Sequence, residues 1–298
     1  MFQKTKRTVR QTMAVVEKEF LLKLRFPLGF ISSIFTASII SLIPLIFIFS
    51  GLLGKSNDEI FAIFYFTHAE KNLIYYCLLY QSIENLYFNS INQFNFLSWL
   101  LMGNILFTFC NKGFTVFTKV FYEEKYWNTI QGMLLTPVNK VLILFGNLIM
   151  VLIESSIYFS LAIIICLFIY PVPIYNVISF FLIGCIMLIA SGGIGFIVGA
   201  ILLTNENFNT IFQLVQFTIL FFSCYSIPII MFPETFQHIS FINPFYHGVS
   251  TARNVYYGIF GQSELFSLIY IITFAISISM LSVYIFNKLW KKYGISGY

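Results

Sequence analysis

The chain has 298 residues, of which 58% are hydrophobic and only 10% charged, and its net charge is +5. A soluble domain has roughly 45–50% apolar and about 25% charged residues, so this composition excludes a soluble fold, which would leave large apolar patches in water. We therefore predict an all-α membrane protein embedded in the lipid bilayer. Its bases gather at particular loops and termini, which membrane topology explains better than binding of nucleic acid.

Residues 1–27 are predicted to form an amphipathic helix at the membrane surface. Bases are dense in this stretch, and Met13, Val16, Phe20 and Leu24 recur at helical spacing. Such a helix is expected to lie on the inner leaflet. A cleaved signal peptide is the competing interpretation. The apolar run that follows is far longer than the roughly 7–15 residues of a signal sequence, which favours a retained span.

Charge-poor runs long enough to cross a membrane come next. A helix needs about 20 residues to cross the ~30 Å hydrocarbon core. Six runs reach this length, so the whole chain, residues 1–298, is predicted to be a single transmembrane domain with six spans. These spans are predicted at residues 28–50, 97–118, 141–170, 174–203, 208–230 and 265–287.

The distribution of Lys and Arg predicts which segments face the cytoplasm. Fourteen of the 17 bases lie in the N-terminal stretch, in residues 112–140 or in the C-terminal tail. The remaining three, Lys55, Lys71 and Arg253, lie on the other side. Because cytoplasmic loops carry the excess of bases, both termini are expected in the cytoplasm and the protein in the cell membrane.

Two predicted spans carry polar side chains that repeat at helical spacing, so each has one polar face. An amide without a partner in hydrocarbon costs several kcal/mol, and each face is therefore expected to meet protein or water. Two interpretations stay open, hydrogen bonds between helices and the lining of a translocation path. The residues are Asn104, Thr108, Asn111 and Thr115 in the second span, and Glu206, Asn209, Gln213 and Gln216 around the fifth.

The fourth predicted span contains a row of small residues. Ser191, Gly195 and Gly199 recur every four residues, the pattern that lets membrane helices pack closely. The glycines do not follow the G-x-G-x-x-G spacing of a nucleotide-binding loop. We therefore interpret the row as a packing surface.

Glu154 is the only ionisable residue deep in a predicted span. A proton relay and a hydrogen-bonded packing residue are both open interpretations. Lys112 and Lys119, near the end of the second span, are expected to snorkel to the membrane interface. The sequence contains no catalytic constellation and no metal-ligand spacing. The chain is therefore not expected to be an enzyme or to bind a metal.

A charged stretch separates the second predicted span from the third. Thr136 is placed to cap the third span, with Pro137 at its first helical position. Upstream of this cap, a short helix would carry Trp127, Ile130 and Leu134 along one side. An apolar edge flanked by charge suits a groove on a protein partner, whereas the alternative is an ordinary interfacial helix.

This stretch resembles the motif that follows the second span in ABC-2 type permeases, which commonly reads Glu-Arg-Glu-x-Gly-Thr-x-Glu-x-Leu-Leu-x-Thr-Pro. The matching residues are Glu124, Thr129, Leu134, Thr136 and Pro137, and the departures are Tyr126, Asn128 and Gln131. After the fifth span, Asn243-Pro244 is similar to the Asn-Pro motif of the family. The resemblance, including the six-span plan, covers essentially the whole chain.

The resemblance implies the transmembrane subunit of an ABC exporter. Two permease chains would pair, as a homodimer or with a similar chain, and separate ATPase subunits would hold ATP and Mg²⁺, leaving no cofactor on this chain. The second and fifth spans would line the path, and a re-entrant segment before the sixth would gate its outer end with Pro228, Pro233, Asn243 and Pro244. The implied cytoplasmic coupling helix would contact the ATPase through Glu124, Trp127, Thr129, Ile130, Met133, Leu134, Thr136 and Pro137.

The polar faces lack a cluster of charges, which favours an amphipathic or hydrophobic cargo such as a drug or lipid. Many Tyr and Phe near the outer loops leave a polysaccharide or glycolipid cargo as an alternative, because aromatic rings stack on sugars. An ATP-independent secondary transporter or channel using Glu154 is a second alternative, and a membrane scaffold without transport activity is a third.

Overall fold

The computed structural model describes residues 2–25, 93–126, 140–202, 208–229 and 232–293. Within these ranges the chain forms eight α-helices and no β-strand. The predicted first span, 28–50, and residues 127–137 of the predicted coupling helix lie outside the described residues. The helices are α1 (Phe2–Arg25), α5 (Gln93–Tyr126), α7 (Lys140–Ile169), α8 (Ile174–Leu202), α9 (Phe208–Phe221), α10 (Glu234–Ile242), α11 (Pro244–Tyr256) and α12 (Gln262–Tyr293).

Four of the described helices are long and apolar enough to cross a membrane, over Ser98–Phe121, Phe145–Phe168, Ile174–Leu202 and Gln262–Leu289. Their outer faces leave large apolar side chains exposed, including Phe168 at 86% and Met280 at 72%. Surfaces of this kind would aggregate in water, whereas contact with lipid tails requires them. The all-helical architecture is therefore that of a membrane protein.

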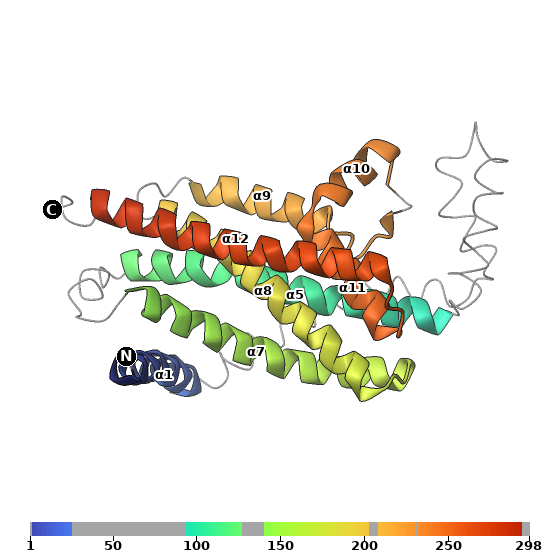
Figure 1. Ribbon diagram of the computed structural model, residues 1–298, viewed down its shortest axis with the longest axis horizontal. Coiled ribbons are helices and arrows are strands. Elements are labelled where there is room, and N and C mark those ends of the chain that lie inside the picture. Colours follow the sequence, from blue (N-terminus) through green and yellow to red (C-terminus); the bar gives the residue numbers. More distant parts are fainter. Residues whose placement is uncertain (1, 26–92, 127–139, 203–207, 230–231, 294–298) are drawn as a thin grey trace.

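The centre of the bundle is the contact between α5 and α8, and α12, α7 and α11 pack around this pair. The span in α5 is 78% buried, compared with 17% for the span in α12, which lies at the periphery. Figure 1 shows α1 beside the first half of α7, and α10 and α11 at the opposite end of the bundle. The end that holds α1 also holds the last turns of α5 and α12 and the first turn of α7.

The row of small residues on α8 lies against α5. A Cβ atom added at Gly195 would overlap the carbonyl oxygen of Phe114, and one at Gly199 would lie 3.0 Å from the carbonyl oxygen of Phe117. Ser191, the third member of the row, is fully buried. The two backbones therefore approach as closely as small residues allow, and the interpretation of this row as a packing surface is confirmed.

Two prolines separate α7 from α8. Pro171 and Pro173 lack backbone N–H groups and so cannot continue the hydrogen bonding of a helix. Helix α7 ends at Ile169 and α8 begins at Ile174, within a residue or two of the ends of the ranges predicted from sequence. The boundary is thus decided locally, by residue type.

Helix α9 is shorter than the predicted fifth span. The range 208–230 was expected to be one continuous helix, but the helix ends at Phe221 and the chain then turns. Cys224 adopts a left-handed conformation, with φ 57°, which is typical of a residue that terminates a helix. The 14 residues of α9 rise about 21 Å, less than the ~30 Å of the hydrocarbon core. The prediction of a full-length helix was wrong because the apolar composition continues past the point where the backbone turns.

Candidate functional site

The polar face of α5 runs from the core to the surface of the bundle. Asn104 and Thr108 are buried, Asn111 is half-buried and Thr115 is exposed. Thr108 Oγ1 donates to the backbone oxygen of Asn104 at 3.0 Å, and Thr115 Oγ1 donates to that of Asn111 at 2.9 Å. The Asn104 side-chain nitrogen is buried without a partner among the described residues. The face therefore has internal hydrogen bonds, one buried amide nitrogen and, at Thr115, an exposed hydroxyl group.

The polar face of α9 meets that of α5 at one pair. Gln216, which is buried, donates from Nε2 to Asn111 Oδ1 at 2.6 Å. Gln213, one turn earlier on the same face, is exposed, and the Asn209 side chain and all of Glu206 lie outside the described atoms. The two faces found by helical spacing are thus joined within one chain, as the packing interpretation expects, while Gln213 stays open to a further partner.

The Asn-Pro motif organises the segment after α9. Asn243 caps α11, since its Oδ1 accepts a hydrogen bond from the Phe245 backbone N–H at 3.0 Å, and Pro244 occupies the first helical position. The Asn243 Nδ2 group donates to the backbone oxygen of Ile219 in α9 at 2.7 Å. Pro233 stands before the first residue of α10, and Pro228 lies in the irregular stretch after α9. One asparagine therefore both starts α11 and ties it to α9.

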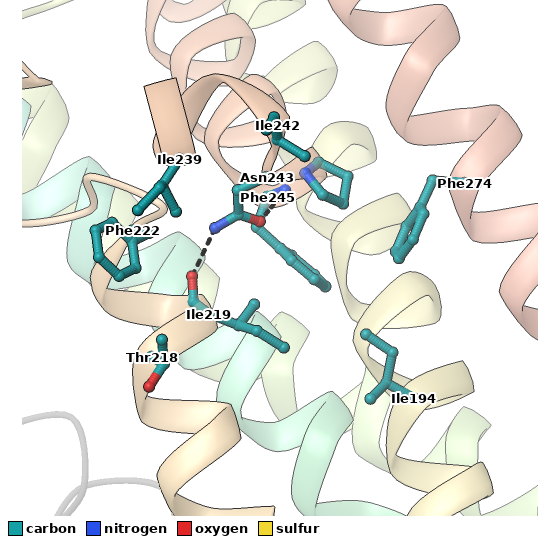
Figure 2. A pocket seen from close by; sticks show the side chains of 10 residues that line it. Ile194, Thr218, Ile219, Phe222, Ile239, Ile242, Asn243, Phe245 and Phe274 are labelled. Carbon is teal, nitrogen blue, oxygen red and sulfur yellow. Dashed lines mark hydrogen bonds between the residues drawn. The ribbon is translucent and has the colours of Figure 1, made fainter. Parts of the chain in front are cut away.

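An apolar pocket of about 270 Å³ lies beside this motif (Figure 2). Side chains from α8, α9, α10, α11 and α12 surround it, and Asn243 stands at its wall with both polar ends of its side chain already bonded. A pocket of this kind offers dispersion contacts and no unpaired charge. Its lining residues are Ile194, Thr218, Ile219, Phe222, Ile239, Ile242, Asn243, Pro244, Phe245 and Phe274.

Arg253 of α11 is a buried cation that the sequence analysis had counted only as an outer base. Its guanidinium donates to the backbone oxygen of Cys224 at 2.9 Å and to that of Tyr225, and it stacks over the Trp99 ring with its Cζ atom 3.5 Å from the ring centroid. Burial lowers the pKa of Arg253 to about 9, so the group is still charged at neutral pH. Because both carbonyl groups belong to the turn that follows Phe221, this cation stabilises the turn that ends α9. A single base in a stretch without other Lys, Arg, Asp or Glu, residues 235–263, was the signal available in the sequence.

Glu154 of α7 has two basic partners that sequence spacing did not reveal. Lys23 of α1 pairs with Glu154 Oε1, and the Nζ of Lys112 in α5 lies 3.9 Å from Oε2. The Glu154 side chain is only 9% exposed. Lys112 was expected to snorkel to the interface, but its side chain is 15% exposed and points into the protein, so that expectation was wrong. Glu154 therefore joins three helices.

The predicted contact with an ATPase lies mostly outside the described residues. Glu124 is in the last turn of α5, where only the backbone is described, and the other members of that set fall in 127–139. Within the described ranges, no group of three His, Cys, Asp or Glu side chains is placed to hold a metal ion. The coupling role remains a prediction.

Four membrane-length helices packed through small residues, with polar pairs and a buried ionic cluster between them, define a multi-span membrane protein. The sequence model of the family described as ABC-2 family transporter protein matches residues 80–285, more than half of the chain. The protein therefore belongs to the ABC-2 transporter family and is a membrane subunit of an ABC transporter. Subunits of this family generally work with separate ATPase subunits. The comparison with curated proteins found no match.

Proposed function

We propose that this membrane subunit belongs to an ATP-driven exporter that moves an amphipathic or hydrophobic substrate, drug or lipid-like, out of the cytoplasm or inner leaflet. Two such chains pair, and each engages an ATPase subunit that binds ATP and Mg²⁺. Both termini and residues 127–137 face the cytoplasm, which is supported by the gathering of α1, the end of α5 and the end of α12 at one end of the bundle.

The contact between Asn111 and Gln216 carries this proposal. It joins α5 and α9 through uncharged polar groups, and Thr115 and Gln213 remain exposed on the same two helices. Next to Gln213, α9 exposes Leu214 at 66%. Neutral hydrogen-bonding groups beside apolar side chains suit a cargo with a polar head and an apolar body. A second chain facing this surface would enclose it as a path.

The bonded contacts supply a route by which ATPase movement reaches the outer end. Helix α5 runs to Tyr126 and includes Glu124, the first residue of the predicted coupling contact, so displacement of that contact tilts α5. The hydrogen bond from Gln216 to Asn111 carries the tilt to α9. Asn243 bonds α9 to the start of α11, so the outer segment from Pro228 to Tyr246 follows. In this mechanism the outer segment opens when α5 and α9 tilt.

Coupling is tested by two substitutions that introduce a negative charge on one side of the predicted coupling helix. In Trp127→Asp and Ile130→Asp, a buried carboxylate would disrupt an apolar contact with the ATPase, and we expect loss of ATP-driven transport. Asn128→Asp introduces the same charge on a different side of that helix and is the matched control. If Trp127→Asp and Ile130→Asp both leave the ATPase bound and transport unchanged, the coupling assignment is wrong.

Transport is measured in proteoliposomes that contain the chain with the ATPase with which it co-purifies. An NBD-labelled phospholipid serves as the lipid-like probe and ethidium as the amphipathic cation, each with and without ATP. Movement away from the ATPase face that requires ATP supports an exporter. Movement that persists without ATP indicates the secondary transporter, and ATP-dependent movement of a lipid-linked oligosaccharide but of neither probe indicates the polysaccharide or glycolipid alternative.

A further inference from the structure

The cluster formed by Lys23, Glu154 and Lys112 draws one side chain from each of α1, α7 and α5. The two lysines bind different oxygens of the same carboxylate, so the three helices meet at one acidic residue. Lys112 Nζ is buried and forms no hydrogen bond among the described residues, so the pairing with Glu154 compensates its charge. A carboxylate and two ammonium groups at this depth in a membrane protein are costly unless they stay together.

The cluster sits at one level of the antiparallel pair formed by α5 and α7. Lys112 lies 14 residues before Tyr126, the end of α5, and Glu154 lies 14 residues after Lys140, the start of α7. At 1.5 Å per residue, each is about 21 Å from the end that borders the predicted coupling helix. The cluster is therefore an ionic link between the two helices that flank that segment.

Helix α1 packs along α7, and both an apolar and an ionic contact hold it there. A Cβ atom added at Gly146 of α7 would lie 2.8 Å from Val15 Cβ, so α1 and α7 are already in close contact there. Lys23 supplies the ionic contact, about two turns further along α1. Met13 and Leu24 remain exposed at 63% and 46%. The apolar side of α1 thus faces outward, while its basic residue Lys23 turns into the protein.

We propose that Lys23, Glu154 and Lys112 form an ionic clamp that makes α1, α5 and α7 move as one rigid body. Glu154 is then a positioning residue, through which displacement of the predicted coupling helix reaches α1 as well as α5. The role of the clamp in transport rests on the proposed function. Its rigidity does not, because the distance between α1 and α7 is measured independently of transport.

The test is a distance measurement between spin labels on α1 and α7, made on the complex with its ATPase in lipid nanodiscs. Labels are attached in a Met13→Cys, Ile157→Cys variant, because both side chains are exposed. With the clamp intact, the distance distribution should be narrow and the same with and without ATP. In Glu154→Gln it should broaden and change with ATP, since the ionic attachment is lost and only uncharged packing contacts such as that of Val15 with Gly146 hold α1 to α7.

Three further variants separate the clamp from general damage. Lys23→Arg keeps the charge and should behave as the unmodified protein. Lys23→Gln should have the same effect as Glu154→Gln, and it replaces Glu154→Gln in the test if Glu154→Gln does not fold. Lys18→Met is the control on the same helix, because Lys18 is 64% exposed and, among the described residues, pairs only with neighbouring Glu19 at 3.6 Å. An unchanged narrow distribution in Glu154→Gln and Lys23→Gln overturns the clamp, as does a distance in the intact protein that changes with ATP.

A second readout distinguishes positioning from stability alone. Transport per ATP hydrolysed should fall at least about fivefold in Glu154→Gln, the lower end of typical coupling between sites, while ATP hydrolysis continues. Equal losses of transport and hydrolysis would show that the residue only stabilises the fold. The outcome for Trp127→Asp does not enter the spin-label result, so failure of the proposed function and failure of the clamp are distinguishable.

Discussion

The close approach of α5 and α8 makes Gly195→Ala a sharp test of the packing. The added methyl group would overlap the carbonyl oxygen of Phe114 and lie 3.0 Å from that of Gly113. Backbone atoms of a buried helix cannot turn away as a side chain can, so α5 must move. Forcing a methylene-sized group into a tight core costs about 1–3 kcal/mol. Replacing glycine by alanine inside a helix stabilises the folded state by about 1 kcal/mol, because alanine has the higher helix propensity.

The control is Gly184→Ala on the same helix, where the nearest atom to the new Cβ is the ring edge of Phe109 at 3.3 Å. The gain in helix propensity is common to both variants, so their difference isolates the backbone overlap, about 1–3 kcal/mol. Thermal unfolding in detergent should place the midpoint of Gly195→Ala below that of Gly184→Ala by about 2–4 °C per kcal/mol. Equal midpoints, or a higher one for Gly195→Ala, would refute the close α5–α8 contact.

Two further variants test the polar contacts by the same unfolding measurement. Arg253→Met removes both hydrogen bonds to the carbonyl groups after α9 and should lower the free energy of unfolding by about 3 kcal/mol or more. Arg253→Lys should have an intermediate effect. A loss near zero in Arg253→Met would contradict the role of Arg253 in ending α9. In a double-mutant cycle, Asn111→Ala and Gln216→Ala should show a coupling of about 0.6–1.7 kcal/mol, the range for hydrogen bonds between membrane helices. Strictly additive effects would contradict the bond.

Helical spacing in the sequence predicted which residues share a polar face, but not which side chains bind each other. The spacing of Asn111 and Gln216 put each on a polar face, yet only the packing of α9 on α5 brings them to 2.6 Å. Gln213 belongs to the same face by sequence and is exposed, whereas its neighbour Phe212 packs against Phe114 of α5. The spacing of residues describes one helix, whereas a hydrogen bond between helices depends on how two helices are placed relative to each other.

Counting the charges along the chain did not predict which charged side chains contact one another. Positive-inside counting treated Lys23 and Lys112 as cytoplasmic bases and left Glu154 without a partner, although all three meet in the structure. Hydropathy likewise read 208–230 as one helix, since it does not register the left-handed turn at Cys224 or the arginine that binds the carbonyl groups there. Both errors concern residues far apart in the chain.

The sequence by itself determined the membrane class, the break at Pro171 and Pro173, the small-residue row on α8 and the family, because each depends on composition or on neighbours within a few turns. The tertiary structure alone decided that α9 stops early, that Glu154 gathers two lysines, and that Asn243 ties α11 to α9. The physical reason is that ion pairs and hydrogen bonds between helices form only where packing brings distant residues within a few ångströms.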